Sequence, residues 1–123
     1  MKLSQKEFDK ITTQSIRRIP SEIRGHLDNV LISVQKRPSR KLLKEMGLPP
    51  GHSLLGVYQG VSLMKRSKVE PPLYPATIFL FQEPIEEMCD TIKEIEKQIE
   101  ITVVHEIAHH FGISEERLAE LGY

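Results

Sequence analysis

Residues 105–122 read HEIAHHFGISEERLAELG, and the first five of them form an HExxH pattern. Four residues advance an α-helix by just over one turn, so His105 and His109 project from one helix face and can reach a single metal ion. Neutral imidazole is a preferred ligand of Zn2+. Glu106 lies beside the first histidine, where its carboxylate can take a proton from a zinc-activated water as a general base. The stretch therefore predicts a helix that holds zinc and hydrolyses an amide bond.

A third zinc ligand is expected after the helix ends. Gly112 can adopt the left-handed conformation that stops a helix and reverses the chain. Glu115 follows three residues later, and a carboxylate is a competent zinc ligand. Ser114 also predicts an N-cap, in which case Glu115 would only compensate the dipole of a final short helix. We expect Glu115 to ligate zinc directly or through a water molecule.

The rest of the chain mixes helical and strand patterns. Apolar spacing predicts helices at 4–18, 38–46 and 91–111, a helical turn at 21–27, and an amphipathic stripe formed by residues 85, 88, 89 and 92. Apolar, β-branched runs predict strands at 29–35, 54–61 and 76–82, and proline and glycine predict loops at 49–51 and 62–75. Thr91 with Glu94 has the capping-box form, so the helix that carries the motif should begin there and stop at Gly112. Because strands and helices do not alternate strictly, the expected class is α+β.

Size and composition limit the kind of protein. A chain of 123 residues predicts one domain, 1–123, and its 17 basic and 17 acidic residues cancel. Zero net charge gives no general attraction to nucleic acid or to an anionic membrane, and no apolar run is long enough to span one. The N-terminus lacks a secretory signal, and the single cysteine, Cys89, suits a reducing cytoplasm.

The motif also carries a family resemblance. HEIAHHFGISEERLAELG resembles the signature of the minimal zincin-like metallopeptidases, a family of short bacterial domains. The similarity continues upstream through IPSEIRGHLDNVLISV at 19–34, LLGVYQGVSL at 54–63 and PATIFLFQEPIE at 75–86. It implies a minimal zincin-like fold, in which a small mixed β-sheet packs against the active-site helix. It also implies that His105 and His109 are zinc ligands, that Glu106 is the base, and that the substrate is a peptide or protein.

Two other functions remain open. The pattern has glutamate where related enzymes have histidine or aspartate, and no methionine follows it, so the chain could be an inactive zincin-like module that binds a metal or a partner. Ala108, Gly112 and Leu118 also fit a helix-turn-helix, but the expected recognition helix has three glutamates and one arginine, which phosphate would repel. Zinc bound without hydrolysis would support the first alternative, and salt-dependent DNA binding the second.

Four other features have two interpretations each. The strand at 76–82 is either an edge strand beside the motif helix, open to an extended peptide, or a central strand paired on both sides. Cys89 falls on the apolar stripe and belongs in the core rather than among nucleophiles. His110 either orients Glu106 from the next turn or is an exposed polar residue. Tyr123 either folds back to stabilise an oxyanion or lies in a frayed terminus.

Overall fold

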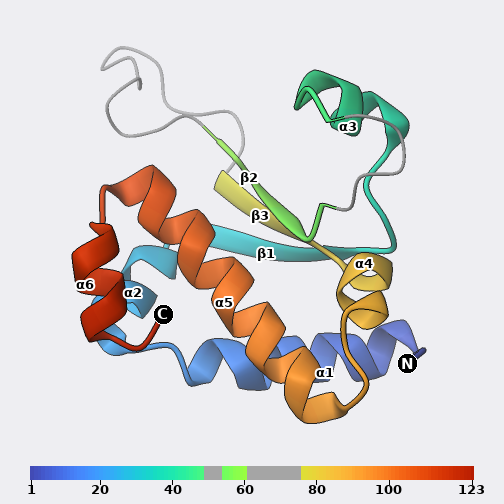
Figure 1. Ribbon diagram of the computed structural model, residues 1–123, viewed down its shortest axis with the longest axis horizontal. Helices are drawn as coiled ribbons and strands as arrows, with labels where there is room; N and C mark the ends of the chain where they lie inside the picture. Colours follow the sequence, from blue (N-terminus) through green and yellow to red (C-terminus); the bar gives the residue numbers. More distant parts are fainter. Residues whose placement is uncertain (49–53, 61–75) are drawn as a thin grey trace.

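The computed structural model describes residues 1–48, 54–60 and 76–123 (Figure 1). Its elements follow in the order α1 (Gln5–Arg17), α2 (Ser21–Arg24), η1 (Gly25–Leu27), β1 (Val30–Gln35), α3 (Arg40–Glu45), β2 (Gly56–Gln59), β3 (Ala76–Phe81), α4 (Gln82–Glu87), α5 (Ile92–Phe111) and α6 (Glu115–Glu120). They confirm the α+β class and the predicted order of helices and strands. The predicted loops at 49–51 and 62–75 and the end of the strand at 54–61 lie outside the described residues.

The sheet is small and mixed. Its order is β1-β3-β2, with β1 parallel to β3 and β2 antiparallel to it. The strand at 76–82 is therefore central in the described sheet, and the interpretation of it as an edge strand is wrong. On one face of β3 the side chains of Ala76, Ile78 and Leu80 belong to the core, while on the other face Phe79 is partly buried and Phe81 is buried. Of the two edge strands in the described part of the chain, β2 is the one that packs next to α5.

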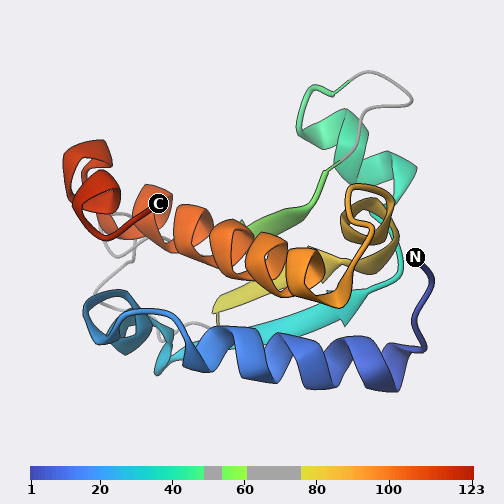
Figure 2. The ribbon, with the colours of Figure 1, turned by 60° about the horizontal axis from the view of Figure 1, so that its bottom comes forward.

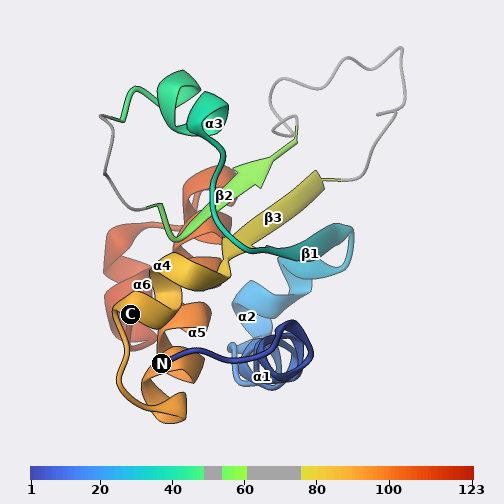
Figure 3. The ribbon, with the colours of Figure 1, turned by 90° about the vertical axis from the view of Figure 1, so that its right-hand side faces the viewer.

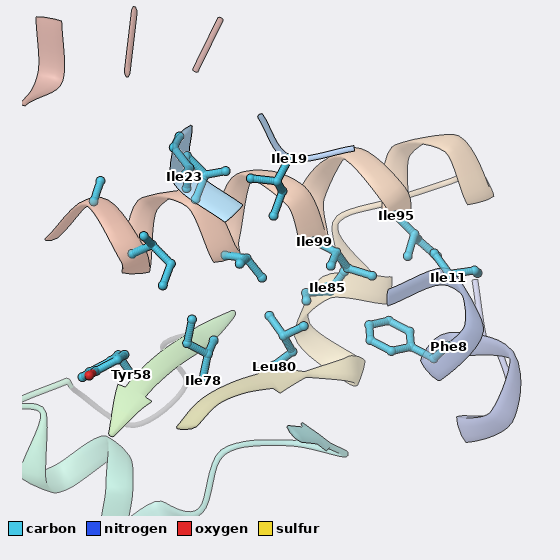
Figure 4. Close-up of a cluster of buried hydrophobic side chains, with 14 of the residues drawn as sticks. Phe8, Ile11, Ile19, Ile23, Tyr58, Ile78, Leu80, Ile85, Ile95 and Ile99 are labelled. Carbon is cyan, nitrogen blue, oxygen red and sulfur yellow. The ribbon is translucent and has the colours of Figure 1, made fainter. Parts of the chain in front are cut away.

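The core lies between the sheet and the helices on one of its faces. Figures 2 and 3 show α1 and α5 side by side on this face, while α3 stands apart from both. Ile78 and Leu80 point from β3 toward α5, and Phe8 enters from α1 (Figure 4). All three side chains are fully buried. Burial of such side chains stabilises a fold by about 1.5–3 kcal/mol each, so this layer holds α5 firmly against the sheet.

α5 is the longest helix, and its ends are set locally. The Thr91 hydroxyl accepts the amide hydrogen of Glu94 at its start, and Gly112 ends it with φ 72°. This φ lies in the left-handed region that favours glycine. The predicted bounds of the motif helix are thus confirmed. Although α5 has 20 residues, it is too polar to cross a bilayer, and the other described helices are no better suited.

The apolar stripe predicted before α5 is only partly correct. α4 ends at Glu87 and a new helix begins after Thr91, so helical spacing does not continue across this segment. Met88 and Ile92 are consequently exposed, at 57% and 46%. Cys89 is buried, which confirms its predicted place in the core.

Candidate metal centre and its surroundings

The C-terminal half of α5 presents two faces of opposite character. Val103, Val104, Ile107 and Ala108 are buried against the core. His105 and His109 are exposed. Because the apolar residues fix the rotation of the helix, the two histidines face outward from a rigid support.

The two imidazoles are available as ligands. Neither forms a hydrogen bond or an ion pair with another residue in the described ranges, and the His109 ring has the His110 ring as a neighbour, 5.0 Å away between centroids. Neutral imidazoles one turn apart are the donors that zinc prefers. The structure therefore brings together the two predicted histidine ligands on one accessible surface.

Glu106 turns toward the sheet edge. The backbone N–H of Tyr58, in β2, donates a hydrogen bond to Glu106 Oε2 at 3.2 Å. Burial raises the pKa of the Glu106 carboxyl, and the Tyr58 hydrogen bond, His109 and His105 oppose the rise. The Glu106 side chain is 26% exposed, so its carboxylate remains accessible to water while held by the strand.

His110 lies on the same side of α5 as Glu106. Its Nε2 is 3.8 Å from Glu106 Oε2, and its ring stacks on the Tyr58 ring with centroids 4.1 Å apart. Burial lowers the pKa of His110, and His109 lowers it further. The interpretation of His110 as a neighbour of Glu106 is thus supported by geometry. The sequence analysis did not identify Tyr58 as part of this site. Alternation along a strand can indicate that a side chain faces inward, but it does not show which helix that side chain contacts.

The structure does not show Glu115, the predicted third zinc ligand, grouped with the two histidines. Glu115 is the first residue of α6, whose N-cap is Ser114. Within the described ranges, no three histidine, cysteine, aspartate or glutamate side chains are grouped so that they could hold a metal ion. Glu115 is exposed and has the surroundings of a helix N-terminal carboxylate. Its role as a ligand remains a prediction from the sequence.

Tyr123 is anchored away from the histidines. Its hydroxyl donates a hydrogen bond to Glu100, and the Lys97 ammonium lies 5.0 Å from the centre of its ring. Its backbone N–H also donates to the Leu118 carbonyl at 2.8 Å. The expectation of a frayed terminus is therefore wrong. Tyr123 does fold back, but its hydroxyl is already bonded to a carboxylate more than one turn before His105.

These observations define how well the site suits zinc. His105 and His109 could supply two nitrogen donors, and β2 holds the Glu106 carboxylate through the Tyr58 N–H. Catalytic zinc usually has three protein ligands and one open position. The described residues fit two of these ligands and the neighbouring base.

Comparisons with known proteins identify the family of the chain. The family model described as "Zincin-like metallopeptidase" matches residues 27–123. A conserved hypothetical protein from Thermo thermophilus has a similar solved structure, with a TM-score of 0.54 and 19% sequence identity, covering 95% of this chain and 98% of that one. That likeness concerns the fold alone. No curated protein matches the chain. The match over 97 of 123 residues shows that the chain belongs to the zincin-like metallopeptidase family.

Proposed function

We propose that the protein is a zinc-dependent peptidase. The observation that carries this proposal is the pair of exposed histidines on α5, with the Glu106 carboxylate between them in sequence and directed toward the sheet edge. Membership of the family supports the same chemistry.

Each residue has a role that its position supports. His105 and His109 would hold zinc through their imidazole nitrogens, with Glu115 as the candidate third ligand. Zinc, when bound, lowers the pKa of water toward ~7 and polarises the carbonyl group under attack. Glu106 accepts the proton of the attacking water and returns it to the leaving amine.

The substrate we propose is an extended peptide lying along β2. In the described sheet β2 pairs with β3 on one side only. On the other side the Tyr58 N–H already donates to Glu106, so a peptide would bond to the remaining outward backbone groups of β2, those of Gly56 among them. A peptide that adds to a sheet edge gains main-chain hydrogen bonds without requiring a particular side chain. β2 therefore replaces the strand at 76–82 as the expected docking edge.

Glu106→Gln tests the function. The variant keeps the size of the side chain but cannot act as a base. We expect zinc to bind near-stoichiometrically to both proteins after purification without chelator, and peptide hydrolysis to fall by roughly 10²- to 10⁴-fold in the variant. Equal turnover by the two proteins would exclude Glu106 as the base.

The same experiment separates the alternatives. Zinc bound by the parent without hydrolysis of any peptide in a diverse library would favour the inactive metal-binding module. The DNA-binding alternative gains no support from α6, because its arginine, Arg117, is bonded to Glu22 and Glu120.

A further inference from the structure

Tyr58 contacts α5 at two points, through its backbone and through its ring. Its N–H donates to Glu106 Oε2 at 3.2 Å. Its ring stacks on His110, one turn later in the helix, at 4.1 Å and an interplanar angle of 24°. The two contacts lie on the same side of α5, so Tyr58 alone restricts the side chains of both Glu106 and His110.

The backbone contact follows from the position of β2. Tyr58 lies opposite Ile78 in the antiparallel pair with β3. Alternate amides of an edge strand point away from the neighbouring strand and need another acceptor. In this structure the acceptor is the Glu106 carboxylate. A hydrogen bond to a charged acceptor is about twice as strong as one between neutral groups, so this contact restricts the carboxylate effectively.

The His110 ring lies next to the same carboxylate oxygen that accepts from Tyr58. At 3.8 Å, His110 Nε2 is too far from Glu106 Oε2 for a good hydrogen bond, but close enough to stand in its way. Tyr58 is only 8% exposed, which leaves the stacked imidazole little freedom. The strand amide and the imidazole therefore both lie next to Glu106 Oε2, and together they confine this oxygen.

This confinement matters because glutamate is itself a zinc ligand. Glu106 is next to His105 in sequence, and an unrestrained carboxylate could bind the metal instead of serving as a base. We propose that Tyr58 and His110 are positioning residues that hold Glu106 against β2, in the orientation required of a base. The inference rests on the proposed function for its catalytic part, but the contact itself can be tested without metal.

The first test uses the metal-free protein and the amide proton resonance of residue 58. A carboxylate acceptor shifts this resonance downfield. We expect Glu106→Gln and His110→Ala to move it upfield, and His110→Phe, which can still stack on Tyr58, to leave it near the parent position. A resonance that none of these variants moves, in proteins that remain folded, would overturn the proposal.

The second test measures hydrolysis and zinc affinity. Tyr58→Ala and His110→Ala should lower kcat by roughly 10- to 100-fold, the usual result of misplacing a reacting group by about 1 Å. Zinc affinity should change little, because neither residue contributes a ligand, and KM should change little in His110→Ala, because His110 lies outside the docking strand β2. His110→Phe and Tyr58→Phe should recover most of the loss.

A matched control removes a methylene elsewhere on α5. Ile99 is fully buried and lies about two helical turns before Glu106, so Ile99→Val should weaken the fold slightly without lowering kcat. A fall in kcat equal to that of His110→Ala would show general destabilisation and overturn the positioning role. If the parent hydrolyses no peptide, the proposed function fails, while the amide resonance still decides whether Tyr58 and His110 hold Glu106.

Discussion

Replacing Gly56 with alanine tests how closely β2 packs on α5. A methyl group added at Gly56 would lie 2.7 Å from Thr102 Cγ2 and 3.0 Å from the Phe79 carbonyl oxygen. Thr102 cannot move away easily, because it is buried and its hydroxyl donates to the Gln98 carbonyl at 2.8 Å. β2 must therefore shift away from the helix that carries the histidines.

The magnitude follows from two opposing effects. Overpacking of this kind costs about 1–3 kcal/mol. Alanine also reduces the conformational entropy of the unfolded chain, which raises the free energy of unfolding by ~0.4–1 kcal/mol. The net loss of unfolding free energy should be about 1–2 kcal/mol, measured by urea denaturation with an unchanged m-value.

A double-mutant cycle assigns the cost to the close contact. Thr102→Ser removes Cγ2 but keeps the hydroxyl, at a cost of ~0.8 kcal/mol for the lost methyl group. In the Thr102→Ser background the penalty of Gly56→Ala should fall by ~0.5 kcal/mol or more, since contacting residues show coupling of this size. The Phe79 carbonyl contact would remain. Additive losses, or a Gly56→Ala protein as stable as the parent, would refute the packing of β2 on α5.

Two further predictions concern residues around the site. Tyr123→Phe should lower the unfolding free energy by ~1 kcal/mol, because among the described residues it leaves the buried Glu100 carboxylate with Lys97, 4.0 Å away, as its one partner. Burial and the hydrogen bond to Glu100 raise the pKa of Tyr123. The stability that its hydroxyl contributes should therefore be complete below pH ~10 and be lost as the pH rises further. Thermal unfolding of the parent and the variant across this pH range measures the loss. Glu115→Ala should weaken zinc affinity by ~10-fold or more in a chelator competition, whereas Glu116→Ala should not. If both variants hold zinc as the parent does, the third ligand lies elsewhere.

Features encoded within a few neighbouring residues could be predicted from the sequence. Thr91 and Gly112 act on the nearest turn of helix, so the bounds of α5 followed from local hydrogen bonds. The common face of His105 and His109 followed from helix geometry alone. The apolar stripe across 85–92 was correct only for Ile85 and Cys89, because spacing does not reveal that α4 ends at Glu87 before the next helix begins.

The environment of Glu106 depended on distant segments. Tyr58 is 48 residues away in the chain, and its N–H reaches Glu106 only because β2 lies at the sheet edge next to α5. The central position of β3 likewise depends on pairing with β1 and β2, which no local pattern specifies. Tyr123 and Glu100 meet for the same reason, through the return of the chain after α6.

Local sequence alone was enough to place two histidines on one face of a helix, with a glutamate next to the first of them, because helix geometry follows from residue spacing. The direction of the Glu106 carboxylate came from the tertiary structure, because it depends on the edge strand that donates the Tyr58 N–H and on the His110 ring that stacks on Tyr58. Periodicity acts over one or two turns, whereas strand order and helix–strand contact are set by packing of the whole core.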